Sequence, residues 1–190
     1  MVDRSEAERA FLSARSRSER IEFLGALLGR ATGNEVIVVG GSAVEVLTAG
    51  RTASLDIDVV TPRDAAIKVI QSWGFEPSGK VFRRSDWEVD IDLVGARFTG
   101  SRSRVRRIET AYGPVHIAGP EDLIIKRLAE LKHWQTTPTW RAELIRQVRL
   151  LLAEYGPQLD EEYLSRIAKQ ADVIDILGDF RTKGTPSPEH

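Results

Sequence analysis

Two aspartates that stand one residue apart suggest the chemistry of this sequence. Asp56 and Asp58 lie in the apolar run Leu55 to Val60, which is typical of a buried strand. Residues two apart in a strand face the same side, so both carboxylates point at one spot and repel each other. A cation between them removes that repulsion, and carboxylate oxygens are ligands that Mg²⁺ prefers. The pair therefore predicts a metal site.

A third carboxylate is expected from the later strand at residues 87–94. Apolar residues at every second position place Asp90 and Asp92 together on the opposite face of that strand. Either of them could join Asp56 and Asp58. Three carboxylates can hold two magnesium ions about 4 Å apart, an arrangement that clamps the attacking and leaving oxygens of an in-line phosphoryl displacement.

A phosphate site is predicted beside the acids by the turn Gly40-Gly41-Ser42, which follows the short apolar strand Val36 to Val39. Glycines let backbone N–H groups approach a phosphate with no side chain in the way. Ser42 adds a hydroxyl donor, and the helix expected after it presents its positive N-terminus to an anion. Basic residues ahead of the third acidic strand either reach the same phosphates or are ordinary strand-edge charges: Lys80, Arg83 and Arg84.

This combination of motifs resembles the nucleotidyltransferase superfamily, the polymerase-beta-like fold. The Gly-Ser turn, the D-x-D pair 14 residues after it and an acid on a later strand carry the resemblance. It implies a mixed sheet flanked by helices and the transfer of a nucleoside monophosphate from an NTP, such as ATP, to a hydroxyl. It also implies that Gly40, Gly41 and Ser42 hold the triphosphate, and that Asp56 and Asp58 bind metal.

The resemblance further implies that a third aspartate binds metal and helps activate the acceptor hydroxyl. Asp92 is favoured because its surroundings, up to Gly95, look more like the third-acid strand of the superfamily, and Asp90 stays as the alternative. The stretch from Ala118 to Lys126 is similar to a helix start in small bacterial members, among them abortive-infection and toxin–antitoxin proteins. This implies that Lys126 contacts nucleotide phosphate and that an antitoxin protein is a partner.

The acceptor stays open at this point: tRNA, a protein or a small molecule. An aminoglycoside-type antibiotic nucleotidyltransferase and a non-catalytic nucleotide-binding module are the alternative functions. The segment 97–107 is either a solvated loop or a patch that contacts RNA phosphates, whose binding would weaken with salt. Its arginines are Arg97, Arg102, Arg104, Arg106 and Arg107.

The elements that must position these residues predict an α+β fold in two parts. Residues 1–118 form the nucleotidyltransferase-like core with N-terminal helices, residues 119–180 a helical region, and residues 181–190 a disordered tail. In the core, Thr61 caps a helix with Pro62 at its first position. One or two helices are expected over 3–29, further helices at 42–47, 121–133, 140–155, 161–170 and 173–180, and further strands at 81–84, 108–111 and 115–118.

Composition excludes several classes of protein. The 190 residues include no cysteine, so disulfides and thiolate metal sites are excluded. The net charge is −1, so any affinity for nucleic acid must come from a local patch. No apolar run approaches the roughly 18 residues of a membrane span, and the charged N-terminus lacks a signal-peptide core. We expect a cytoplasmic protein without membrane contact.

Overall fold

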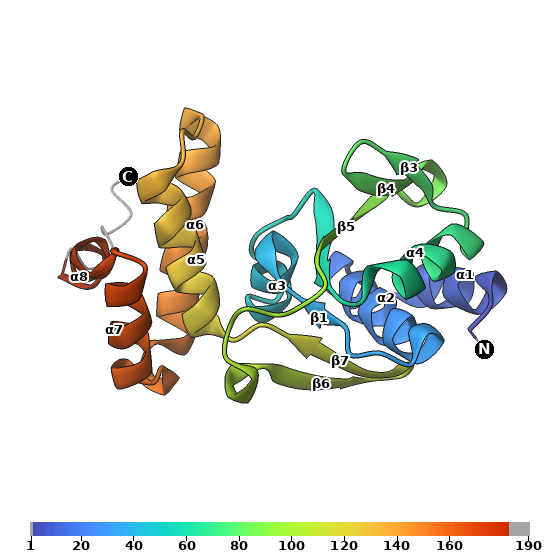
Figure 1. Ribbon diagram of the computed structural model, residues 1–190, viewed down its shortest axis with the longest axis horizontal. Helices are drawn as coiled ribbons and strands as arrows, with labels where there is room; N and C mark the ends of the chain where they lie inside the picture. Colours follow the sequence, from blue (N-terminus) through green and yellow to red (C-terminus); the bar gives the residue numbers. More distant parts are fainter. Residues whose placement is uncertain (1, 183–190) are drawn as a thin grey trace. The chain divides into compact units, whose positions relative to one another are not determined.

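The computed structural model describes residues 2–182, and the chain divides into two compact units (Figure 1). The first unit, Met1–Gly119, carries the sheet and four helices, and the second, Pro120–His190, is helical in its described part. The sequence placed the division after residue 118. The observed mixture of one sheet and surrounding helices confirms the predicted α+β class.

The first unit is built on a seven-stranded sheet in the order β3-β4-β5-β2-β1-β7-β6. β2 pairs in parallel with β5 and antiparallel with β1, and β1 pairs in parallel with β7, so the sheet is mixed. The central strands are short and largely buried, as their apolar sequences predict. The strands are β1 Ile37–Val38, β2 Asp56–Val60, β3 Glu76–Ser78, β4 Val81–Arg84, β5 Val89–Gly95, β6 Arg106–Thr110 and β7 Gly113–Ile117.

The helices of the first unit begin and end at recognisable signals. Asp3 caps α1 by accepting from the Glu6 amide, Ser16 caps α2 in the same way, and α2 ends at Gly33 in the left-handed conformation. α2 packs closely on β7, since a Cβ added at Gly25 would lie 2.7 Å from a methyl of Val115. The helices are α1 Arg4–Ser13, α2 Arg17–Thr32, α3 Gly40–Leu47 and α4 Arg63–Ser72.

Some local features differ from the sequence prediction. The N-cap of α4 is Pro62 rather than Thr61, and the buried Thr61 hydroxyl has no hydrogen-bond partner among residues 2–182. β3 was not predicted, because it contains Pro77, which a strand accepts only at a sheet edge. Trp87 belongs to a 3-10 turn, Ser85–Trp87, and Glu88 after it has a positive φ of 51°, so β5 begins only at Val89.

The second unit consists of helices at the positions that the sequence predicts (Figure 1). Within it, α5 packs against α6 and α7, and α7 packs against α8. The last helix includes residues 181 and 182, so the predicted disordered tail begins too early, and residues 183–190 lie outside the described part. The helices are α5 Pro120–His133, α6 Pro138–Tyr155, α7 Glu161–Gln170 and α8 Ile174–Thr182.

In residues 2–182, none of the helices combines the length and the apolar character that crossing a membrane requires.

Candidate metal and nucleotide site

Three carboxylates meet at the centre of the sheet. Asp56, Asp58 and Asp92 each offer an oxygen atom, and these oxygens all lie within 4.8 Å of one another. The parallel pairing of β2 with β5 sets Asp58 opposite Asp92. Because neighbouring strands lie about 4.8 Å apart, side chains that share a face at this register come together. Asp92 is buried and the other two are half-buried, so the cluster is partly shielded from water.

Asp90 shares the face of Asp92 but has a different partner. On the neighbouring strand β4, Arg83 lies opposite Asp90 and donates from Nε to Oδ1 at 2.9 Å and from Nη2 to Oδ2 at 2.6 Å. This bidentate bond holds the pKa of the Asp90 carboxyl below its ordinary value. The register of β4 therefore gives the Asp90 carboxylate an arginine partner, and Asp92 is the aspartate of β5 that joins Asp56 and Asp58.

Gly40 begins the turn against which the cluster packs. Its φ of +62° is left-handed, and a Cβ at this position would lie 1.9 Å from Oδ2 of Asp58. Only glycine meets both conditions. The next amide, that of Gly41, donates to the same Oδ2 at 3.2 Å. The turn thus fixes the orientation of the Asp58 carboxylate.

Ser42 holds the same turn to β2 from inside the protein. Its side chain is fully buried, and its hydroxyl donates to the carbonyl of Val39 at 2.9 Å and accepts from the amide of Asp58 at 3.1 Å. The amide of Val39 in turn donates to the carbonyl of Asp58 at 2.9 Å. Ser42 therefore links the start of α3 to the strand that carries two of the acids.

Glu45 is a supporting residue that the sequence reading did not single out. It is 1% exposed on α3, accepts from the amide of Ser54 at 2.8 Å and pairs with Nε of Arg17 at 3.3 Å. Arg17 also donates to the carbonyl of Ser54. These bonds fix the backbone two residues before Asp56. An acid inside an otherwise apolar helix was the available signal, since a buried charge needs a partner.

The three basic residues ahead of β5 have three different roles. Lys80 places its ammonium nitrogen 3.2 Å from Oδ2 of Asp92, and that contact is the main reason why the lysine pKa is raised above its ordinary value. Arg83 binds Asp90. Arg84 is buried, donates to the carbonyl of Trp73 at 2.6 Å and lies over the ring of Trp87, so its role is structural.

Lys126 lies on α5 in the second unit. Its ammonium is 3.8 Å from Oε1 of Glu130, one helical turn later, and 5.1 Å from the centre of the Trp134 ring. The side chain is more than half exposed. Within α5, the lysine is thus a surface residue in a local i,i+4 ion pair.

The arginine-rich segment, residues 97–107, forms an irregular stretch, a 3-10 turn at Arg102–Arg104 and the start of β6. Arg102 pairs with Glu35 and Arg107 with Glu109, so acids offset part of its charge. A Cβ at Gly119 would lie 2.6 Å from the carbonyl of Arg104, which places the end of the first unit against this segment.

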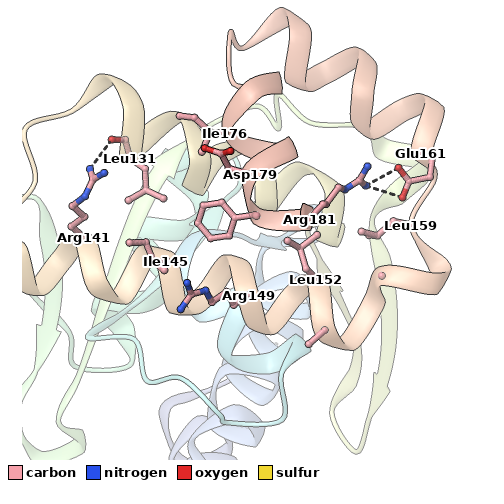
Figure 2. Close-up of a pocket in the computed structure, with 13 residues that line it drawn as sticks. Leu131, Arg141, Ile145, Arg149, Leu152, Leu159, Glu161, Ile176, Asp179 and Arg181 are labelled. Atoms are coloured by element: carbon pink, nitrogen blue, oxygen red, sulfur yellow. Dashed lines mark hydrogen bonds and ion pairs between the residues drawn. The ribbon is translucent and has the colours of Figure 1, made fainter. Parts of the chain in front are cut away.

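The second unit contains a cavity of about 600 Å³ between its helices (Figure 2). Its walls include Leu131, Ile145 and Leu152, and at its edge Arg181 pairs with Glu161 at 2.7 Å. All the lining residues belong to α5, α6, α7, α8 and the turn before α7. None of them is a residue that the sequence predicted for the site.

Comparison with solved structures bears on the fold. No protein-family model matches the sequence, and no curated protein sequence does. The chain is similar to an antigenic nucleotidyltransferase-like protein from Paracoccidioides brasiliensis, with a TM-score of 0.59 and 11% identity over 88% of this chain and 94% of that one. The chain is also similar to the antibiotic-resistance factor ANT(2'')-Ia, with a TM-score of 0.49 and 15% identity over 96% of this chain and 95% of that one. The first likeness shows that this chain has a nucleotidyltransferase-like fold.

Proposed function

We propose that this protein is a magnesium-dependent nucleotidyltransferase that moves a nucleoside monophosphate from an NTP to a hydroxyl group. The observation that carries the proposal is the meeting of Asp56, Asp58 and Asp92 beside the Gly40 turn. The nucleotidyltransferase-like fold supports it. Asp56, Asp58 and Asp92 act as metal ligands, and Asp90 remains paired with Arg83 outside the metal site.

The donor set fits magnesium. All three side chains offer oxygen, and their spacing of at most 4.8 Å suits ligands of shared ions. The ammonium of Lys80 already lies against Asp92, so the cluster attracts cations. When bound, magnesium neutralises phosphate charge and supports in-line displacement.

The protein's own groups position the reactants. The amide of Gly41 already donates to Asp58, so the dipole of α3 and a glycine backbone without side chains favour a triphosphate at Gly40, Gly41 and Ser42. The Ser42 side chain is buried, so its contribution comes from the backbone. An acceptor hydroxyl attacks the α-phosphorus, the bond to pyrophosphate breaks, and the hydroxyl proton passes to Asp92 and on to solvent. Lys126 is proposed to contact the nucleotide phosphates.

An RNA such as tRNA is the acceptor to test first. Arg97 lies five positions after Asp92, so their Cα atoms are at most about 18 Å apart in an extended chain. Arg97, at that distance, binds the backbone of an acceptor strand, and its charge repels a cationic drug. A protein or a small molecule, including an aminoglycoside, is a second class of acceptor for the same chemistry.

The experiment that tests the proposal uses labelled NTPs, magnesium and total tRNA, with protein and aminoglycosides as parallel acceptors. We expect labelled product and pyrophosphate, and a loss of at least about a thousandfold in Asp58→Asn and Asp92→Asn, because each removes a charge from the metal site. Asp90→Asn is the matched control on the same strand and should keep most activity. Full activity in Asp58→Asn would refute the assignment.

Other results would point to other functions. Binding of NTP and magnesium without pyrophosphate release, with any acceptor, would favour a non-catalytic nucleotide-binding module. A toxin role makes a further demand: production of the intact protein should arrest growth of a host cell, production of Asp58→Asn should not, and a cognate antitoxin should relieve the arrest.

A further inference from the structure

Lys80 is held at the acidic cluster by the geometry of a tight turn. The register of β3 with β4 pairs Ser78 with Val81, which leaves only Gly79 and Lys80 in the connection. Gly79 has a φ of +64°, whereas Lys80 does not have a positive φ. A positive φ at the first central residue alone fits a type II′ turn, in which glycine is favoured at that place. The backbone of Lys80 is therefore well defined.

The next pair in the sheet directs the lysine to the acids. Val81 lies opposite Asp92 on β5, so Lys80 stands one residue beyond that pair. Its ammonium reaches Oδ2 of Asp92 at 3.2 Å, and the carboxylate oxygens of Asp56 and Asp58 lie within 4.8 Å of that of Asp92. Most of the side chain is exposed, at 81% against 10% for Asp92. A charge on such a side chain can leave the cluster without disturbing the core.

We propose that Lys80 is a displaceable counter-ion that occupies the acidic cluster in the absence of metal and moves to the nucleotide phosphates when metal and NTP bind together. The inference rests on the proposed function, because it takes Asp56, Asp58 and Asp92 as metal ligands. An ammonium and a divalent metal ion at the same carboxylate repel each other, so a metal ion at Asp92 weakens the contact between Asp92 and Lys80. Metal without nucleotide must therefore bind in competition with the Lys80 ammonium. When a triphosphate is also bound, its phosphates give the displaced ammonium a new partner.

The consequence is a coupling between metal and nucleotide. Binding free energies are linked. The factor by which bound NTP raises the affinity for metal therefore equals the factor by which bound metal raises the affinity for NTP. Lys80 contributes to that factor by penalising the state with metal alone. The site is then loaded chiefly by the metal–nucleotide complex, and unproductive occupation by free metal is reduced.

The test measures binding of Mn²⁺, a paramagnetic substitute for Mg²⁺, by electron paramagnetic resonance with the full-length protein. Lys80→Met should bind Mn²⁺ alone roughly three- to tenfold more tightly, the effect of removing a unit charge several ångströms from a divalent ion near water. The gain in Mn²⁺ affinity on adding a non-hydrolysable NTP analogue should shrink in Lys80→Met. Lys80→Arg, which keeps the charge, should stay close to the wild type in both respects.

A matched control and a second measurement separate this role from a general effect of charge. Lys68→Met removes an exposed lysine from α4 and should leave Mn²⁺ affinity unchanged. Without metal, Lys80→Met should also unfold at a lower temperature than the wild type, because three carboxylates lose a counter-ion, and saturating Mn²⁺ should remove most of that difference.

The outcomes distinguish the two proposals. Suppose that the wild type binds Mn²⁺ and Asp58→Asn does not. If Lys80→Met then binds Mn²⁺ as tightly as the wild type or more weakly, the role of Lys80 is refuted and the metal site stands. If the wild type binds no Mn²⁺ with or without nucleotide, both the metal site and the displacement of Lys80 are refuted.

Discussion

Gly40 shows at the scale of one residue how the backbone makes room for the proposed chemistry. We predict that Gly40→Ala lowers stability by more than the roughly 1–2 kcal/mol of a left-handed alanine, because the new methyl collides with the Asp58 carboxylate, 1.9 Å from its position. The displaced carboxylate should also weaken Mn²⁺ binding at least about tenfold, by loss of a charged ligand. Thermal unfolding and Mn²⁺ titration measure the two effects.

Gly33→Ala is the matched control for that prediction. Gly33 has nearly the same φ, +65°, but an added Cβ meets nothing within 4 Å. This variant should lose only the stability that a left-handed alanine costs, and it should bind Mn²⁺ like the wild type. Equal metal binding in both variants would show that the Asp58 carboxylate does not need the space at Gly40.

The ambiguity between Asp90 and Asp92 shows what the sequence could not decide at this scale. The two aspartates share a face of one strand, and alternation treats them alike. The difference comes from the register of β4, which sets Arg83 opposite Asp90 and Val81 opposite Asp92. That register depends on the two-residue turn at Gly79 and on a strand containing Pro77, neither of which an apolar pattern reveals.

At the scale of elements, the predictions held where pattern and tertiary packing agree. Strong alternation in β5 and a buried run in β2 placed the acidic strands within one or two residues. The prediction that Thr61 caps α4 was wrong, because its side chain is buried against the core and Pro62 takes the cap position. Glu45 was missed because its partners, Arg17 and Ser54, are distant in sequence.

Helix α2 carries a prediction about pH. Burial, with the nearby charge of Glu19 as a smaller cause, raises the pKa of Glu22 above its ordinary value of 4.5. A raised pKa means that the folded state binds the proton more tightly than the unfolded state, so this group favours folding below pH 4.5 and loses that contribution as pH rises through the raised pKa. At neutral pH its charge opposes folding.

Glu22→Gln should therefore raise the unfolding temperature at pH 7 and change it little near pH 3.5, where the wild-type side chain is protonated in both states. Glutamine and glutamate have similar helix propensities, so the comparison isolates the charge. Unfolding followed by circular dichroism from pH 3.5 to 8 measures the difference. A stabilisation that is the same at every pH would exclude ionisation of Glu22 as its cause.

At the scale of the whole molecule, the proposed chemistry is concentrated in the first unit. The three acids, the Gly40 turn and Lys80 all lie in Met1–Gly119. The order of strands followed by helices was enough to predict the fold class. The sequence assigned the second unit no chemistry except Lys126, because its helices show only the apolar periodicity of packing. The cavity among α5–α8 arises from that packing, and no sequence motif marks the residues that line it.

This division leads to a prediction about metal removal, read out by hydrogen exchange over the whole chain. A ligand that binds only the folded state stabilises it by about 2.7 kcal/mol at a hundred times its dissociation constant. If the two units unfold separately, Mg²⁺ protects amides of the unit that binds it. Adding Mg²⁺ after chelation should slow exchange in β2, β5 and α3 and leave the core amides of α5–α8 unchanged.

Asp58→Asn serves as the reference for that experiment, because it keeps the shape of the side chain and removes a metal-binding charge. In this variant Mg²⁺ should change exchange in neither unit. Equal slowing across both units of the wild type would mean that the chain unfolds as one cooperative body, in which binding anywhere protects every core amide. Slowing confined to α5–α8 would place the strongest magnesium site among the helices and would contradict the assignment to Asp56, Asp58 and Asp92.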